Sequence, residues 1–301
     1  MKKIGAYQNG NYKVIIFDDG TKIRQTDEDK FLPIRLESVD MKITNRCDMG
    51  CPFCHEKSVP NGEHADLTNP IISTFLPYTE IAIGGGNPLC HPDLENFLIK
   101  LKELRCFPSM TVNAHHFLEN YEKLLDFQKR NLFYGLGISA IDITQELADK
   151  IAQFPNAVVH TIAGITTENM LIKMGSLGIK KVLILGYKNF GRGELYYSDE
   201  IKQNIESLNK HLKYIMPLFD VVSFDNLAIE QLNVKSLLTE EEWNKFYMGD
   251  DGGYTMYIDL VNQKYAQSST STERFEFLNT INDMFLDIRR RKEIGDTENA
   301  D

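Results

Sequence analysis

Two patterns of apolar residues alternate along most of the chain, beginning near residue 36. Short runs rich in β-branched residues are separated by longer stretches in which apolar positions lie three or four residues apart. The first pattern is typical of strands and the second of amphipathic helices. Strands are predicted at 38–44, 80–83, 110–113, 134–139, 157–162 and 181–185, with 221–224 as a further candidate. Helices are predicted at 69–78, 92–105, 118–130, 144–154, 167–177 and 199–216.

This alternation of strand and helix, repeated six times, predicts the fold class. Strands that alternate with helices form βαβ units, and such units build a parallel sheet. We therefore expect an α/β fold over residues 36–226, in the form of a partial (β/α)6 barrel of the TIM type. A doubly wound open sheet is the alternative, and apolar periodicity by itself does not separate the two.

The alternation is absent at both ends of the chain. Residues 1–35 contain two glycine-containing turn signals between strand-like runs, which predicts an N-terminal β-hairpin extension. Residues 227–301 predict an α+β cap that comprises a short helix, a hairpin and a long final helix. The final helix is expected to include Phe275, and the polar tail after Gly295 is expected to be disordered.

Composition narrows the class of protein. The chain has 301 residues, of which 42% are hydrophobic and 25% charged, as in an ordinary globular protein of one or two domains. Its net charge of −10 argues against a broad surface for nucleic acid or anionic membranes. No signal peptide is visible, and no stretch approaches the ~18 consecutive apolar residues of a membrane span. We therefore expect a cytoplasmic protein with reduced thiols.

The candidate chemistry lies in the cysteines. The chain has five, and Cys47, Cys51 and Cys54 fall within eight residues with the spacing C-x3-C-x2-C. They directly follow the first predicted barrel strand, and β/α barrels build their active sites on the loops after the strands. Clustered cysteines in a reducing compartment more often bind metal or do chemistry than form disulfides. Cys90 and Cys106 are expected to be packing thiols.

Three thiolates are one ligand short of a closed metal site. Structural zinc takes four ligands, and a 4Fe–4S cluster usually takes four cysteines. Zinc with His55 as the fourth ligand is one interpretation of this segment. An iron–sulfur cluster with one open iron, to which a substrate or cofactor binds, is the other, and three thiolates on one short loop favour it.

The segment from Cys47 to Cys54 resembles the signature of the radical S-adenosylmethionine (radical SAM) superfamily, which has an aromatic residue where Phe53 stands. The resemblance implies that Cys47, Cys51 and Cys54 each bind one iron of a 4Fe–4S cluster, and that S-adenosylmethionine chelates the fourth iron. It also implies reductive cleavage of this cofactor to methionine and a 5'-deoxyadenosyl radical, which abstracts hydrogen from a substrate. An external one-electron reductant, such as a flavodoxin or ferredoxin, is implied as a partner.

A second similarity follows the second barrel strand. The run from Gly84 to Pro88 is similar to the Gly-Gly-Glu-Pro motif of the family, with Asn87 where the family most often has Glu. The resemblance implies that Gly85, Gly86 and Asn87 contact the cofactor. An amide keeps a carbonyl acceptor but carries no charge, so we expect a hydrogen bond at this position without an ion pair.

Weaker similarities lie at the ends of later strands. The resemblance implies polar contacts from Asn113 and Ser139 to the ribose and carboxylate of the cofactor, and adenine contacts from Ile162 and Gly164. His160 stands where the adenine motif has its first glycine.

Other polar residues near these motifs are expected to be less specific. The glycine-rich loop 186–193, which carries two cations, is either a flexible connection or a substrate or cofactor contact. His115, His116 and Asp48 are expected to face solvent.

The remaining cysteines limit the number of clusters. Residues 227–301 contain none, and two further thiols are too few for a second all-cysteine cluster, so a single cluster is expected. The substrate is left open between a peptide and a small metabolite, and the acidic charge disfavours nucleic acid. The alternative function is a non-enzymatic module that binds zinc or an iron–sulfur cluster on an α/β scaffold.

Overall fold

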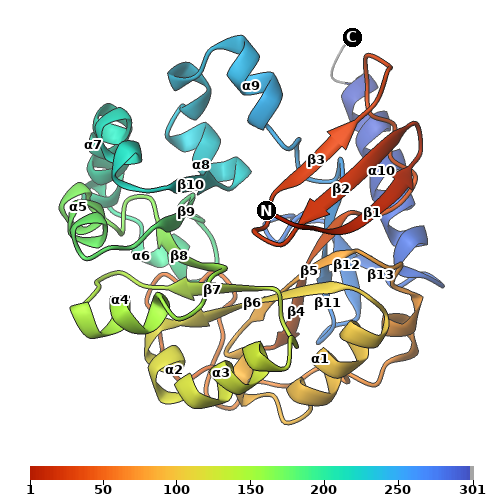
Figure 1. The fold of residues 1–301 in the computed structure, drawn as a ribbon, viewed down its shortest axis with the longest axis horizontal. Helices are drawn as coiled ribbons and strands as arrows, with labels where there is room; N and C mark the ends of the chain where they lie inside the picture. The colour runs from red at the N-terminus through yellow and green to blue at the C-terminus, as the bar shows by residue number, and fades with distance from the viewer. Residues whose placement is uncertain (299–301) are drawn as a thin grey trace.

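The computed structural model of the protein describes residues 1–298, and its largest feature is a curved ten-stranded sheet (Figure 1). The strand order is β10-β9-β8-β7-β6-β5-β4-β11-β12-β13, and β4 to β10 follow one another in the sheet and run parallel. These parallel strands are β4 (Ser38–Thr44), β5 (Glu80–Gly85), β6 (Phe107–Asn113), β7 (Gly135–Ser139), β8 (Ala157–Ile162), β9 (Lys181–Leu185) and β10 (Val221–Phe224). All the predicted strands are present, and the strictly sequential order of β4 to β10 in a curved sheet confirms the partial barrel, since a doubly wound sheet reverses its strand order.

Helices follow the parallel strands and cover the convex side of the sheet, where α1 to α4 are visible in Figure 1. Two predicted helices differ in detail. The stretch 69–78 forms only a short 3-10 helix, Pro70–Thr74, and 118–130 is divided between α2 and α3 at Asn120. The helices are α1 (Leu94–Glu103), α2 (Ala114–Glu119), α3 (Tyr121–Lys129), α4 (Gln145–Ile151), α5 (Glu168–Ser176), α6 (Arg192–Tyr196), α7 (Asp199–Ile215), α8 (Asn226–Gln231), α9 (Glu240–Phe246) and α10 (Ile281–Glu298).

The C-terminal segment extends the main sheet. Strand β11 (Thr255–Asp259) pairs in parallel with β4, and β12 (Lys264–Ala266) and β13 (Phe275–Glu276) continue the sheet in antiparallel fashion. The expected helix at Phe275 is therefore wrong, and α10 begins only at Ile281.

The apolar spacing around Phe275 suits a helix, but contacts with distant residues override it. Phe275 pairs with Tyr265 across β12 and β13, and Arg291 of α10 lies over its ring at 3.9 Å. The polar tail that was expected to be disordered after Gly295 is helical as far as Glu298, and residues 299–301 lie outside the described residues.

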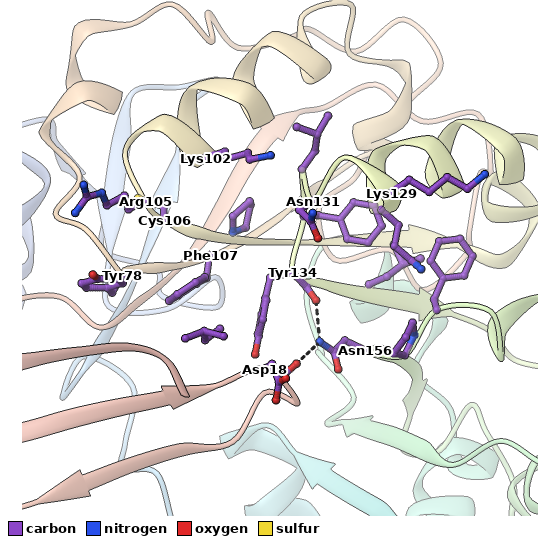
Figure 2. Close-up of a pocket in the computed structure, with 18 residues that line it drawn as sticks. Asp18, Tyr78, Lys102, Arg105, Cys106, Phe107, Lys129, Asn131, Tyr134 and Asn156 are labelled. Carbon is purple, nitrogen blue, oxygen red and sulfur yellow. Dashed lines mark hydrogen bonds between the residues drawn. The ribbon is translucent and has the colours of Figure 1, made fainter. Parts of the chain in front are cut away.

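The N-terminal residues form a separate antiparallel sheet of three strands, in the order β1-β2-β3. This sheet lies at the amino ends of the parallel strands, because its last turn contacts residues that directly precede β7 and β8. Asn156 donates hydrogen bonds to the carbonyls of Asp18 and Tyr134, as Figure 2 shows. The three strands are β1 (Lys3–Asn9), β2 (Tyr12–Phe17) and β3 (Lys22–Gln25).

A cavity of about 920 Å³ opens at this amino end, beside Phe107 and Tyr134 (Figure 2). Cys106 lines it, is buried, and has a pKa that burial raises to about 12, so it is a packing thiol as expected. The cavity lies at the opposite end of the parallel strands from the three clustered cysteines. Within the described residues, no helix has both the length and the apolar character to cross a membrane.

Candidate active site

The cysteine loop directly follows β4, at the carboxyl edge of the parallel sheet. Cys47, Cys51 and Cys54 are half-buried free thiols. The backbone N–H of Cys47 donates to the carbonyl of Val59 at 2.9 Å, and that of Cys54 donates to Cys51 at 3.2 Å. These bonds curl the loop so that all three cysteines project from one short turn of chain.

The glycine-rich loop after β5 packs directly on the cysteine loop. The N–H groups of Gly86 and Asn87 donate to the carbonyls of Thr44 and Arg46, each at 2.7 Å. A Cβ atom on Gly86 would lie 2.2 Å from the Arg46 oxygen, and one on Gly85 would lie 2.5 Å from that of Thr44. The glycines are therefore required for contact between the two loops.

Asn87 is almost completely buried and caps a short 3-10 helix, Pro88–Cys90. Its Oδ1 accepts a hydrogen bond from the N–H of Leu89 at 3.1 Å. One lone pair of the amide oxygen therefore serves the fold, and the second has no hydrogen-bond donor among the described residues. Cys90 donates its thiol proton to the Asn87 carbonyl at 2.9 Å, which agrees with a packing thiol.

The loop 186–193, whose role the sequence left open, contacts the cysteine loop from the other side. Arg192 donates from Nε to the carbonyl of Cys51 at 2.9 Å and from Nη1 to that of Ser58 at 3.0 Å. Its backbone N–H donates to Cys54 at 3.0 Å. Gly191 has a φ of 68°, and a Cβ atom there would lie 2.3 Å from the carbonyl oxygen of His55. This loop is therefore an anchor for the cysteines.

The other predicted cofactor contacts lie at the same edge of the sheet, in different surroundings. Asn113 pairs with Ser139 across β6 and β7, so the structure brings these two polar residues together. The Asn113 side chain accepts from the N–H of His115 at 2.9 Å and so begins α2. Ile162 ends β8. Gly164 packs on α7, where an added Cβ would lie 2.7 Å from the side chain of Ile201.

Phe53 and His160 each contact a neighbouring residue near the carboxyl edge of the sheet. The Phe53 ring lies 5.9 Å from that of Tyr196 in α6. The His160 ring lies over Gly137, because a Cβ atom on that glycine would be only 2.3 Å from it. Burial lowers the pKa of His160 to about 4, so the imidazole is neutral at pH 7.

The expectation that His116 faces solvent is wrong, whereas the side chain of Asp48 does face solvent and is 69% exposed. The His116 side chain is 2% exposed, and its Nε2 donates to Oδ1 of Asp48 at 2.7 Å. This hydrogen bond holds the pKa of Asp48 below its ordinary value. Asp48, Cys47 and His116 place one ligand atom each within 4.8 Å of one another. His115, by contrast, is 57% exposed.

A cluster of charged side chains connects the cysteine loop with the C-terminal segment. Lys42 of β4 lies 2.8 Å from Glu56 and 3.5 Å from Asp259 of β11. Lys188 donates a hydrogen bond to Ser269 at 3.0 Å. Burial of His55 and the nearby positive charge of Lys188 lower the pKa of His55 to about 3. This cluster was not predicted from the sequence, although Lys42 within the apolar strand at 38–44 is a signal that could have indicated it.

A family model described as the radical SAM superfamily matches residues 41–227. The chain belongs to the radical SAM superfamily. The match confirms the resemblance drawn from the cysteine and glycine motifs. The matched residues include all three cysteines and the whole parallel sheet except the three residues that begin β4.

Solved structures of radical SAM proteins have a similar fold. SuiB of Streptococcus suis bound to S-adenosylmethionine has a TM-score of 0.57 at 14% identity, over 84% of this chain and 64% of that chain. SuiB bound to its precursor peptide SuiA has a TM-score of 0.56 at 13% identity, over 86% and 67% respectively. The chain thus spans about two thirds of the length of SuiB. No curated protein matches the chain.

The donor set fits an iron–sulfur cluster better than a single zinc ion. A tetrahedral zinc ion, with Zn–S bonds of ~2.3 Å, holds its sulfurs within about 4 Å of one another. In the described part of the chain, the group of ligand atoms that lies within 4.8 Å does not include Cys51, Cys54 or His55. His55 instead lies 3.5 Å from Glu56. Three thiols that are spread more widely than the ligands of one zinc ion suit an iron–sulfur cluster, in which each sulfur binds a different iron.

Proposed function

We propose that this chain is a radical SAM enzyme with a single 4Fe–4S cluster bound by Cys47, Cys51 and Cys54. The observation that carries the proposal is the set of three free thiols on one curled loop at the carboxyl edge of the sheet, against which the glycine loop packs. Such a cluster, with S-adenosylmethionine bound, supplies a 5'-deoxyadenosyl radical that abstracts hydrogen from a substrate. The remaining thiols, Cys90 and Cys106, have packing contacts that support a single cluster.

The residues of the carboxyl edge would bind and orient the cofactor. The backbone of Gly85 and Gly86 and the free lone pair of Asn87 would receive its ammonium group. Asn113 and Ser139, which pair across two strands, would contact its ribose and carboxylate. Phe53, Ile162 and Gly164 would contact its adenosine portion.

The substrate would bind at the mouth of the barrel, beside the charged cluster around Lys42 and Lys188. A barrel mouth closed by bound substrate excludes water and stray hydrogen donors from a reactive radical. Between the two substrate classes we favour a peptide over a small metabolite, because SuiB, which shares the fold, has been solved with a precursor peptide bound. We also propose a flavodoxin or ferredoxin as the electron donor and a cytoplasmic location.

The experiment is a metal analysis followed by a cleavage assay, both on protein purified without oxygen. We expect about four iron and four sulfide per chain. Addition of dithionite and S-adenosylmethionine should yield 5'-deoxyadenosine. Replacement Cys51→Ala should abolish cleavage and most of the iron, whereas Cys106→Ala, a matched control at the other end of the strands, should retain both.

Two outcomes would contradict the proposal and favour the alternative of a non-enzymatic metal-binding module. One is stoichiometric zinc without iron. The other is an intact cluster that yields no 5'-deoxyadenosine with any donor. To identify the substrate, candidate peptides and metabolites should be added to the assay, and the mass of each product compared with that of its precursor.

A further inference from the structure

Asp48 and His116 form a hydrogen-bonded pair beside the first cysteine of the cluster loop. We propose that His116 is a positioning residue that holds Asp48 next to Cys47 and offsets the charge of its carboxylate, and thereby sets the reduction potential of the cluster. The inference rests on the proposed function, because it assumes that Cys47 binds an iron–sulfur cluster.

His116 is the buried member of the pair, and Asp48 is 69% exposed. The Asn113 side chain caps α2 through the N–H of His115, which fixes the start of the helix that carries His116. His116 is 2% exposed, and its Nε2 lies 2.7 Å from Oδ1 of Asp48. Cys47 contributes the third atom of a group whose members lie within 4.8 Å of one another. A buried donor on a capped helix is therefore aimed at the cluster loop.

His116 and Arg192 hold different parts of this loop. Arg192 binds the carbonyl oxygens of Cys51 and Ser58, which belong to its second half and the chain that follows. His116 binds the side chain of Asp48, in the first half, just before Gly50 with its φ of 60°. Loss of His116 should therefore free only the segment between the first two cysteines.

The charges predict opposite effects for the two partners. Addition of an electron to a cluster is less favourable next to a negative charge, so the Asp48 carboxylate beside Cys47 lowers the reduction potential. The N–H of His116 offsets this charge through its hydrogen bond. Removal of His116 should lower the potential further, and removal of the carboxylate charge should raise it. A purely structural tether would not produce shifts of opposite sign.

The experiment measures the midpoint potential of the cluster in the full chain, reconstituted without oxygen, by redox titration followed by EPR. His116→Ala should have a more negative potential than the wild type, and Asp48→Asn, which keeps a hydrogen-bond acceptor, a more positive one. His116→Gln, which keeps a donor, should lie between wild type and His116→Ala. His115→Ala is the matched control, since its side chain is exposed on the same helix, and it should have the wild-type potential.

The outcomes separate this inference from the proposed function. A wild-type chain that binds no iron–sulfur cluster would overturn both. A wild-type chain with a normal cluster, whose potential is unchanged in His116→Ala and Asp48→Asn or shifts in the same direction in both, would overturn the inference alone. If His116→Ala retains too little cluster to titrate, His116→Gln and Asp48→Asn are compared instead. His116→Gln should have a more negative midpoint potential than the wild type and Asp48→Asn a more positive one, and any other result would overturn the inference.

Discussion

The side chain of Asn87 makes one contact within the fold, and we propose a second one to the cofactor. Its oxygen caps the 3-10 helix Pro88–Cys90, a bond that a short Asn side chain makes readily within its own turn. Glu, the more frequent residue of the family at this position, has a longer side chain that does not favour this turn. We infer that the exchange of Glu for Asn replaces an ion pair to the cofactor with a hydrogen bond and adds a local cap.

Replacement Asn87→Ala should weaken S-adenosylmethionine binding more than cluster loading. Loss of one hydrogen bond of about 0.5–1.5 kcal/mol predicts a rise in Kd of roughly 2- to 12-fold. The measurement is calorimetric titration of the reconstituted protein with the cofactor, alongside its iron content. Asn87→Asp, which keeps the cap and adds a charge that attracts ammonium, should bind at least as tightly as the wild type. Equal losses of iron and affinity in Asn87→Ala would contradict the assigned role.

At the scale of elements, the loop between β9 and α6 is the least expected part of the site. It brings Arg192 to the carbonyl oxygens of Cys51 and Ser58, and Gly191 to the backbone of His55. The guanidinium can reach two carbonyls at once because its donors are arranged in a planar fork. This element therefore fixes the cysteine loop without contributing a ligand.

Replacement Arg192→Ala should make the cluster labile without unfolding the protein. Two lost hydrogen bonds predict a decrease of about 1–3 kcal/mol in the free energy of the closed loop. Iron release to a chelator, followed by absorbance, should be several-fold faster than in the wild type. Arg192→Lys should restore only part of the retention. Arg130→Ala is the control, because Arg130 is 40% exposed and forms surface ion pairs, and its iron release should be unchanged.

At the scale of the whole molecule, the N-terminal sheet is held to the barrel through a buried carboxylate. Glu37, which precedes β4, is fully buried and accepts from Arg24 at 3.0 Å, from Lys22 at 3.4 Å and from Tyr12 at 2.5 Å. Burial by itself would raise the pKa of Glu37, but Lys22 and Arg24 outweigh it and hold the pKa below its ordinary value. The N-terminal sheet is thus fixed at the amino end of the barrel, away from the carboxyl edge that carries the cysteine loop.

Replacement Glu37→Gln should decrease the free energy of unfolding by about 3–5 kcal/mol at pH 7, because it leaves the Arg24 guanidinium, 9% exposed, without its carboxylate and leaves Lys22 with Glu80 alone. A carboxyl group whose pKa is lowered by folding stabilises the protein above its unfolded pKa, and this contribution is lost as pH falls through the folded pKa. The difference between wild type and variant should therefore shrink below the ordinary value of 4.5. Urea unfolding at several pH values measures it.

The matched control for this prediction is Glu80→Gln. Glu80 also pairs with Lys22, but its side chain is 26% exposed, so the loss should be at most about 1 kcal/mol. Equal losses in the two variants, or a difference that does not depend on pH, would contradict the role of Glu37 as the buried partner.

The sequence by itself determined the local features of this protein. The strands of the parallel sheet were predicted because the period of apolar residues is set within a few neighbouring positions. The three cysteines and the glycine run were also recognisable, because each motif lies within a single loop and so within a few neighbouring positions. Loops at the carboxyl ends of adjacent parallel strands must lie on one edge, so their proximity also followed from the pattern.

Only the tertiary structure decided which distant residues meet. Asp48 and His116 are 68 residues apart, Arg192 and Cys51 are 141 residues apart, and no local pattern marks either pair. Strand β11 pairs with β4, and Phe275 joins a strand although its spacing suits a helix, because burial against a partner outweighs intrinsic preference. Such contacts depend on the packing of the whole sheet, which periodicity within one segment does not encode.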